Sequence, residues 1–226
     1  GLMPAHFKAV LFDLDGTLVD SAPDLVAAVN SLRRDLGLPE IIYEALRGRA
    51  GHGIRGLVWS ALRIRNEDPP FAGLSDAFLT HYEAHIHDGT HPFAGVEAML
   101  TALTRRGIAW GIVTNKPERL AKIVVGNNPV ISEARCVIGW DTVGKMKPAP
   151  DSLILAMKTL GVMSSEVLYV GDDARDTLAA HNAGCRAAAA LWGYTAGNTQ
   201  PADWGSDFLL KSPAELLNLL SEPVAG

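Results

Sequence analysis

Short apolar runs that end in polar clusters recur along this chain. The first covers residues 8–13, three similar runs cover 108–113, 167–170 and 187–191, and a weaker fifth covers 135–138. A continuous apolar run of this length is typical of a strand buried on both faces, as in a parallel sheet. The pattern therefore predicts the strands of a buried parallel sheet.

Helical periodicity separates most of these runs. The predicted helices cover residues 96–106, 151–160 and 176–182, and a short last helix covers 216–220. Strands that alternate with helices indicate βαβ units and a mostly parallel sheet with right-handed crossovers. We therefore expect an α/β protein.

The stretch from about residue 22 to residue 91 lacks this alternation. Its periodicity predicts consecutive helices over 23–36, 53–63 and 75–87, and no strand. A helical insert after the first strand indicates a second subdomain. The expected division is an all-helical subdomain at 21–91 and a sheet domain formed by 1–20 and 92–226.

Composition narrows the class of protein. The 226 residues include 20 Lys and Arg and 25 Asp and Glu, so the net charge is −5, and 48% of the residues are hydrophobic. This acidic, apolar balance argues against intrinsic disorder and against a nucleic-acid protein built on a basic face. No apolar run approaches the ~18 residues of a membrane span. With only Cys136 and Cys185, we expect buried free thiols and a cytoplasmic protein. We expect a monomer or a homodimer.

Polar clusters stand next to the predicted strands and helices. They are Asp13-Leu-Asp-Gly-Thr17, Thr114-Asn-Lys116, Lys145-Met-Lys-Pro148 and Gly171-Asp-Asp-Ala-Arg-Asp176. Active sites of open parallel sheets form outside the carboxyl ends of the strands. We therefore expect these carboxylates, lysines, hydroxyl and amide to converge at one edge of the sheet.

Carboxylates and lysines gathered in this way suit metal binding and the chemistry of phosphate esters. Neighbouring carboxylates repel one another unless a cation lies among them, and hard oxygen ligands suit Mg²⁺. A carboxylate beside a phosphate ester can attack phosphorus. A second carboxylate two residues further on can protonate the leaving oxygen and then activate water. Gly16 permits the sharp turn that such a junction needs.

These motifs resemble those of the haloacid dehalogenase (HAD) superfamily, in its phosphoglycolate phosphatase-like branch. The segments that carry the resemblance are Asp13-Leu-Asp-Gly-Thr-Leu-Val-Asp-Ser21, Val113-Thr-Asn-Lys-Pro117, Lys147-Pro-Ala-Pro150 and Gly171-Asp-Asp-Ala-Arg-Asp176. The resemblance implies a Rossmann-like parallel sheet core flanked by helices, with an inserted all-helical cap. It also implies Mg²⁺-dependent hydrolysis of a small phosphate ester.

The resemblance implies catalytic roles for individual residues. Asp13 would be the nucleophile and Asp15 the general acid and base. Lys147 would neutralise Asp13 and the phosphate, with Lys145 as its rival by proximity. An acid at position 15 favours phosphoryl transfer over dehalogenation, but phosphomutases share this pair of carboxylates. A phosphomutase, and a phosphate-binding protein with a silent site, therefore remain alternatives.

The resemblance likewise implies ligands for the metal and for the phosphate. The implied Mg²⁺ ligands are Asp13, the backbone carbonyl of Asp15, and Asp172. Asp176, or in its place Asp173, would orient a metal-bound water. Thr114 and Asn115 would hold the phosphate, and Lys116 is a further candidate for contact with the substrate.

A glycine-rich loop in the expected cap bears on specificity. It opens a predicted helix, so it offers backbone N–H groups and the positive end of a helix dipole. Its candidates for binding an anionic group are Arg47, Arg49, His52 and Arg55. This set suits a substrate with a carboxylate as well as a phosphate, such as 2-phosphoglycolate or a phosphorylated lactyl sugar.

Two related branches fit the local sequence. The loop, Trp110-Gly and Trp204-Gly-Ser-Asp207 favour the N-acetylmuramic acid 6-phosphate phosphatases of peptidoglycan recycling, whereas Gly193-Tyr194 is shared with phosphoglycolate phosphatases. The chain departs from both branches around 123–134, which puts the helix expected there in doubt. His81, His85, His87 and His91 have spacings compatible with zinc, but we expect a solvated helix face instead.

Overall fold

A six-stranded parallel sheet forms the centre of the structure. The computed structural model describes residues 6–197 and 199–220. The strand order is β5 (Val137–Ile138), β4 (Ala109–Val113), β1 (Ala9–Phe12), β6 (Val167–Gly171), β7 (Arg186–Ala190) and β8 (Phe208–Leu210). Every neighbouring pair in this sheet is parallel. The prediction of an α/β fold built on a parallel sheet is confirmed.

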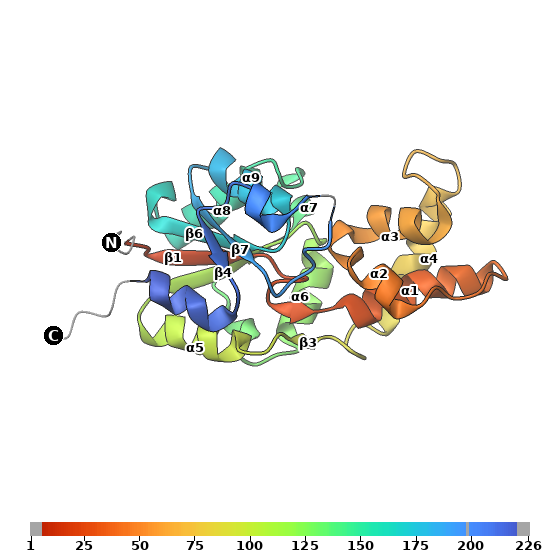
Figure 1. Cartoon of the computed structure of the whole chain (residues 1–226), viewed down its shortest axis with the longest axis horizontal. Helices are drawn as coiled ribbons and strands as arrows, with labels where there is room; N and C mark the ends of the chain where they lie inside the picture. Colours follow the sequence, from red (N-terminus) through yellow and green to blue (C-terminus); the bar gives the residue numbers. More distant parts are fainter. Residues whose placement is uncertain (1–5, 198, 221–226) are drawn as a thin grey trace.

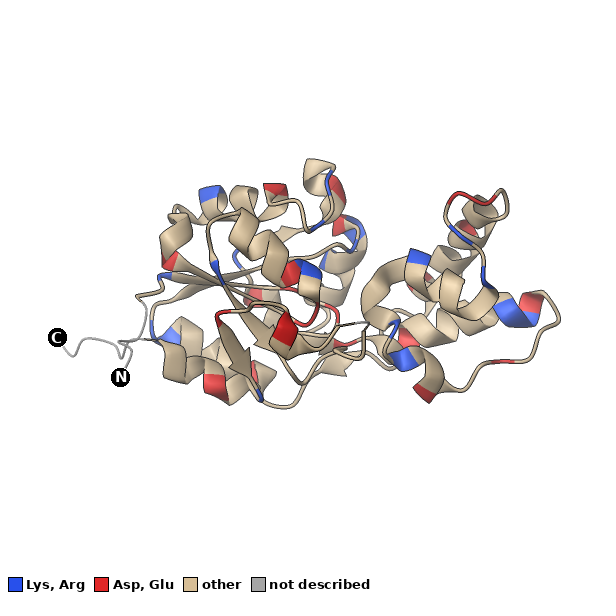
Figure 2. Cartoon of the chain, turned by 45° about the horizontal axis from the view of Figure 1, so that its top comes forward, with Lys and Arg blue, Asp and Glu red and all other residues tan. Residues whose placement is uncertain are grey.

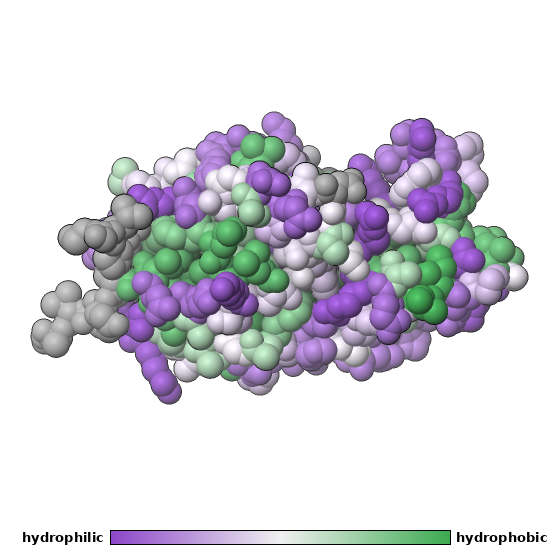
Figure 3. Space-filling model, in the orientation of Figure 1, coloured by the Kyte–Doolittle hydropathy of each residue, from purple (hydrophilic) through white to green (hydrophobic). Residues whose placement is uncertain are grey.

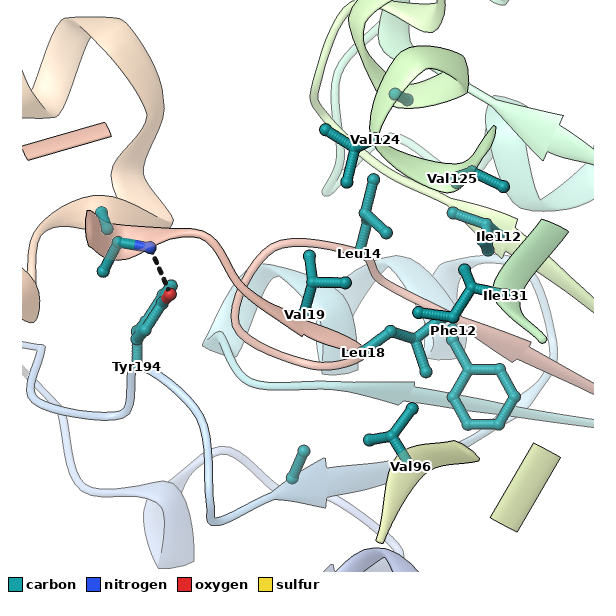
Figure 4. Packing of buried hydrophobic residues seen from close by; sticks show 14 of the residues in the cluster. Phe12, Leu14, Leu18, Val19, Val96, Ile112, Val124, Val125, Ile131 and Tyr194 are labelled. Atoms are coloured by element: carbon teal, nitrogen blue, oxygen red, sulfur yellow. Dashed lines mark hydrogen bonds between the residues drawn. The ribbon is translucent and has the colours of Figure 1, made fainter. Parts of the chain in front are cut away.

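Helices cover both faces of the sheet (Figure 1). The helices α5 (Val96–Arg105) and α6 (Glu118–Gly126), with the 3₁₀ helix η5 (Pro213–Leu219), lie on one face, and α8 (Asp151–Leu160) and α9 (Ala174–Asn182) on the other. The side chains of β1 alternate between the two faces. Val10 and Phe12 pack with the first set of helices, and Ala9 and Leu11 pack with the second. Figure 4 shows the first core, with Phe12 beside Ile112 and Val96. Because both faces are buried, β1 reads as a continuous apolar run.

A second group of helices lies beyond the carboxyl ends of the strands (Figure 1). It consists of α1 (Ala22–Asp35), α2 (Tyr43–Arg47), the 3₁₀ helix η1 (Ala50–His52), α3 (Gly53–Leu62) and α4 (Phe71–Ala84). We call this group the helical layer. Helix α1 packs against α2, α3 and α4, so it forms the centre of the layer.

The two connections to the helical layer run side by side. Strand β2 (Val19–Asp20) pairs antiparallel with β3 (His91–Pro92). The prediction of no strand up to residue 91 is therefore wrong at this point, since so short a strand arises from tertiary pairing and leaves no periodicity. We propose that this pair bounds a helical unit at 21–91 and a sheet unit formed by 1–20 and 92–226.

Several elements differ from the sequence prediction. The helix expected at 75–87 begins at Phe71, and the one expected at 216–220 is the 3₁₀ helix η5. The helix that was in doubt, α6, forms and ends at Gly126. Strand β8 was not predicted. The remaining short helices are η2 (Ile131–Glu133), α7 (Trp140–Val143), η3 (Ser164–Glu166) and η4 (Pro201–Asp203).

The structure also shows the state of the cysteines and the hydropathy of the surface. Cys136 and Cys185 are both free thiols, and Cys185 is buried. Among the described residues, no helix is long and apolar enough to cross a membrane. Hydrophobic residues reach the surface on both the sheet layer and the helical layer, with hydrophilic residues between them (Figure 3).

Candidate active site

The turn after β1 places the first motif at the carboxyl end of the sheet. The backbone N–H of Leu14 donates to Asp13 Oδ1 at 2.8 Å. Gly16 has a φ of +82°, and a Cβ atom there would collide with the Asp172 carboxylate and the Tyr194 ring. The turn therefore requires glycine. Because β1 and β6 are neighbours with opposite connections, Asp13 and Asp172 meet at the point where the strand order reverses.

Three carboxylates gather there. Asp13, Asp172 and Asp176 each offer an oxygen within 4.8 Å of the others. Burial raises the pKa of Asp13 to about 7, against the lowering effect of Lys147. Burial, and then repulsion from Asp13 and Asp176, raises the pKa of Asp172 well above its ordinary value. A divalent cation would relieve this repulsion, and an all-oxygen donor set fits Mg²⁺.

Two further contacts orient Asp172. The Thr17 hydroxyl donates to its Oδ1 at 2.9 Å, and the Tyr194 backbone N–H donates to its Oδ2 at 3.0 Å. The first motif and the loop after β7 therefore hold the same carboxylate. Tyr194 enters the site in this way although it lies outside the four motifs.

Lys147 supplies positive charge beside these carboxylates. Its Nζ lies 2.7 Å from Asp176 Oδ1 and 3.4 Å from Asp13 Oδ1, and it donates to the Tyr169 hydroxyl at 2.5 Å. Burial lowers the pKa of Lys147, but Asp13 and Asp176 outweigh this effect, so the net shift is upward. The rival Lys145 lies at the surface, 3.7 Å from Asp151. The structure thus brings Lys147, and not Lys145, to Asp13.

The second motif fixes the loop that carries Lys147. Asn115 Nδ2 donates to the Lys147 carbonyl at 3.1 Å, and the Lys147 N–H donates to Asn115 Oδ1 at 2.7 Å. Thr114 is buried, and its hydroxyl accepts from the Lys116 N–H at 3.1 Å. Both residues line the cavity described below.

The Asp15 carboxylate has partners outside the carboxylate cluster. Its Oδ1 accepts from the Ser21 hydroxyl at 2.6 Å, and Lys116 Nζ lies 3.2 Å from both of its carboxylate oxygens. Lys116 Nζ also donates to the Tyr82 hydroxyl of α4 at 2.5 Å. The buried ammonium group of Lys116 therefore links Asp15 to the helical layer. The sequence suggested a substrate as a partner of Lys116. In the structure, the partners of its ammonium group are Asp15 and Tyr82.

The two acids of the fourth motif separate in space. Asp176 belongs to the carboxylate cluster, whereas Asp173 caps the start of α9 by accepting from the Arg175 N–H at 2.8 Å. Arg175 Nη2 also donates to the Gly51 carbonyl of the helical layer at 3.1 Å. Of the two acids, the structure thus brings Asp176 to Asp13 and Asp172.

A cavity of about 500 Å³ lies between the two layers. From the sheet layer it is lined by Asp13, Asp15, Thr114, Asn115, Lys116, Pro117, Leu120, Trp140, Met146, Lys147, Asp173, Arg175 and Asp176. From the helical layer it is lined by Leu25, Ala50, Gly51, His52, Gly53, Ile54, Arg55, Phe71, Ser75, Phe78, Leu79 and Tyr82. Figure 2 shows acidic segments gathered where the two layers meet. The carboxylates of the cavity come from the sheet layer, and its phenylalanines come from the helical layer.

The four candidate residues of the cap loop divide into two pairs. His52 and Arg55 line the cavity, whereas Arg47 and Arg49 are not among its lining residues. Arg47 Nη1 lies 2.9 Å from Asp20 Oδ1, and its guanidinium lies over the Tyr194 ring. The charge of Arg47 is thus paired at the connection between the layers, and its contact with a substrate stays a prediction.

The remaining sequence candidates do not form a second site. In the described part of the chain, the only group of three or more potential metal ligands is the Asp13 cluster, so the histidines form none. His85 instead pairs with Asp88 at 2.7 Å. Sequence reasoning assigned no role to Tyr82, Tyr169 or Arg175. Of these three residues, only Arg175 could have been identified from the sequence as a candidate, because it lies inside the fourth motif.

Comparison with known proteins agrees with this geometry. The family model of the haloacid dehalogenase-like hydrolases matches residues 10–190. A phosphoglycolate phosphatase of Xanthomonas campestris pv. campestris is 43% identical over 92% of this chain and 94% of its own. An N-acetylmuramic acid 6-phosphate phosphatase of Pseudomonas aeruginosa is 37% identical over 95% of each chain.

A solved structure with a similar fold agrees with the family match. The crystal structure of a predicted phosphoglycolate phosphatase from Haemophilus somnus superimposes with a TM-score of 0.84 at 26% identity, over 95% of this chain and 98% of that one. The family match spans more than half of the chain, and the two relatives cover nearly all of it. This chain therefore belongs to the haloacid dehalogenase-like hydrolase family.

Proposed function

We propose that this protein is a Mg²⁺-dependent phosphomonoester hydrolase that works through a phosphorylated Asp13. The observation that carries the proposal is the placement of Asp13 on the cavity wall, with Asp172, Asp176 and Lys147 around it. Two relatives of this family, at 43% and 37% identity, are named as phosphatases. The lining of the cavity therefore supplies a nucleophile and positive charge for a phosphate ester.

In the first step, an Asp13 carboxylate oxygen attacks phosphorus. A phosphorus–oxygen bond forms while the bond to the ester oxygen breaks, and the leaving oxygen takes a proton from the Asp15 carboxyl. Lys147 and the side chains of Thr114 and Asn115 would neutralise and hold the phosphoryl oxygens. Ser21 and Lys116 hold the Asp15 carboxyl group at 2.6 and 3.2 Å.

In the second step, water attacks phosphorus of the phosphorylated Asp13. Asp15, now a carboxylate, accepts a proton from this water, and inorganic phosphate leaves with the Asp13 carboxylate restored. When bound by Asp13, the Asp15 carbonyl and Asp172, Mg²⁺ would supply charge to offset the phosphate oxygens. Asp176 would help to orient this site. The contacts of Tyr82 and Gly51 with the sheet layer would hold the helical layer over the cavity and limit the access of bulk water.

We propose a small phosphorylated organic acid as the substrate, with 2-phosphoglycolate as the first candidate. The relative with 43% identity is named a phosphoglycolate phosphatase. His52, Arg55 and Arg175 line the cavity and offer positive or hydrogen-bonding groups to a carboxylate. The two free cysteines are compatible with action in a reducing cytoplasm.

The cavity favours N-acetylmuramic acid 6-phosphate as a second candidate. Its volume of about 500 Å³ exceeds what a two-carbon acid fills, and Phe71, Phe78 and Leu79 form an apolar wall. An acetamido sugar with a lactyl group offers both apolar surface and a carboxylate. A phosphomutase of the same fold would also use Asp13 and Asp15, but it would require a bisphosphate activator and release no net phosphate.

Substitution of the nucleophile tests the reaction. Asp13→Asn should lower Mg²⁺-dependent release of phosphate from an aryl phosphate by at least about 1,000-fold, because the amide cannot attack phosphorus. The exposed Asp203, in η4, provides a matched control, and Asp203→Asn should retain the wild-type rate. An Asp13→Asn enzyme with near wild-type activity would overturn the assignment.

The substrate is tested by comparing kcat/KM. The wild-type enzyme is assayed with 2-phosphoglycolate, N-acetylmuramic acid 6-phosphate and neutral sugar phosphates. We expect an acid to be the best substrate. Equal kcat/KM values for acids and neutral esters would contradict selection of a second anionic group.

A further inference from the structure

Arg175 occupies the first turn of α9, between the carboxylate cluster and the helical layer. It follows Asp173, which caps this helix, and it precedes Asp176 of the carboxylate cluster. Its side chain lines the cavity and is 41% exposed. The guanidinium therefore faces the same space as Asp13, from an element that belongs to the sheet layer.

Asp173 and the helical layer hold this guanidinium in place. Its Nε donates to Asp173 Oδ1 at 2.9 Å, and its Nη2 donates to Asp173 Oδ2 at 3.3 Å and to the Gly51 carbonyl at 3.1 Å. Among the described residues, no hydrogen bond uses Nη1. A guanidinium carries five N–H donors in a rigid fork, so its Nη1 donors remain for a ligand in the cavity.

The surroundings of Arg175 favour an anionic ligand. On the cavity wall, His52 and Arg55 of the helical layer add two further donors to this region. Asp173 lies close to Arg175, and its two oxygens are occupied by the guanidinium and the start of the helix. Asp13 and Asp176 lie within ion-pair distance of Lys147.

We propose that Arg175 binds the carboxylate of the phosphorylated acid, and so determines the preference for acids over neutral esters. This inference rests on the proposed phosphatase function and deepens it. The two N–H groups of Nη1 can donate to the oxygens of a carboxylate, and the charge of the guanidinium strengthens such bonds. The attachment of Arg175 to α9 places the carboxylate subsite on the same layer as Asp13.

The contact with Gly51 places this subsite next to the helical layer. The same guanidinium reaches the loop that carries His52, so a carboxylate bound at Arg175 also lies beside this loop. A neutral ester lacks the carboxylate that would make this contact.

Matched pairs of esters test the proposal. Ethyl phosphate is 2-phosphoglycolate with a methyl group in place of the carboxylate, and N-acetylglucosamine 6-phosphate is N-acetylmuramic acid 6-phosphate without the lactyl group. For whichever acid the wild type prefers, Arg175→Gln should lower the kcat/KM ratio of acid to neutral ester by roughly 10- to 100-fold, the range expected for a hydrogen bond to a charged group. Arg175→Lys, which keeps the charge, should recover part of this ratio.

The control is Arg186→Gln at the exposed start of β7, which should leave the ratio as in the wild type. If Arg175→Gln lowers kcat/KM equally for both members of a pair, Arg175 acts only through Gly51 and the proposal is wrong.

A binding measurement separates this proposal from the proposed function. Calorimetric titration of Asp13→Asn protein with the acid and with its neutral partner should show tighter binding of the acid, and Arg175→Gln in the same background should remove this advantage. Wild-type protein that hydrolyses no ester would contradict the phosphatase function alone. Unchanged preference for the acid in the double variant would overturn the role of Arg175.

Discussion

At the scale of single residues, Gly16 shows how closely the site is packed. Its backbone adopts a positive φ of 82°, which favours glycine, and the place of a Cβ is already taken by the Asp172 carboxylate and the Tyr194 ring. The turn and the carboxylate cluster are thus built from the same contact. Gly37 has a similar φ of 72°, but a Cβ atom added there would meet nothing within 4 Å.

This pair of glycines gives a matched prediction. Gly37→Ala should lower the free energy of unfolding by about 1 kcal/mol through backbone strain alone. Gly16→Ala carries the same strain and displaces Asp172, so it should lower stability further and lower kcat/KM by at least tenfold. Urea unfolding and kinetics of the two variants check this. Equal stability losses with unchanged kcat/KM would contradict the role of the contact at Gly16.

At the scale of elements, a small cluster of polar side chains stabilises the connection between the layers. Asp20 of β2 accepts from Arg47 of α2 at 2.9 Å and from the Tyr194 hydroxyl at 2.7 Å. The same hydroxyl accepts from the Ala22 N–H at 2.8 Å, at the start of α1 (Figure 4). Burial opposes the ionisation of Asp20, but the hydrogen bonds of Arg47 and Tyr194 outweigh it and hold the pKa of Asp20 below its ordinary value.

This lowered pKa predicts a pH dependence of stability. A carboxyl whose pKa is lower in the folded state stabilises that state above its unfolded pKa, and loses the contribution as pH falls through the folded value. Asp20→Asn should therefore cost roughly 1.5–3 kcal/mol at pH 7, and this difference from the wild type should shrink below about pH 4. Urea unfolding of both proteins across this range provides the measurement. A difference that stays constant with pH would show that the charge of Asp20 is not involved.

At the scale of the whole molecule, the chemistry lies where two layers meet. Lys116 and Arg175 of the sheet layer contact Tyr82 and Gly51 of the helical layer. The four residues that make these contacts all line the cavity. The repelling carboxylates beneath it are the part of the molecule that gains most from a cation.

Metal binding should therefore stabilise the whole chain. A ligand that binds only the folded state contributes about 2.7 kcal/mol at a hundredfold excess over its Kd, which is a rise in Tm of roughly 5–10 °C at this chain length. Mg²⁺ should produce such a rise in the wild type, and chelation should reverse it. Asp172→Asn should remove the response, while Asp203→Asn should retain it. A Mg²⁺-induced shift that persists in Asp172→Asn would contradict the assigned site.

The sequence by itself determined the strands and the motifs. The buried strands read as apolar runs because both faces of a parallel sheet are covered, and Asp13, Thr114 and Asp172 follow those strands directly. Since parallel strands place their carboxyl ends at one edge, chain order alone brought these groups together. The short pair of β2 and β3, and strand β8, left no such pattern.

Only the tertiary structure decided which charged groups work together. It separated Lys147 from Lys145 and Asp176 from Asp173, and it assigned Arg47 to the connection between the layers. It also brought Tyr82 and Gly51 to Lys116 and Arg175. Such pairings depend on which side chains from distant segments meet, and local periodicity carries no information about that. The sequence identified the candidate groups of the site, and tertiary packing determined their partners.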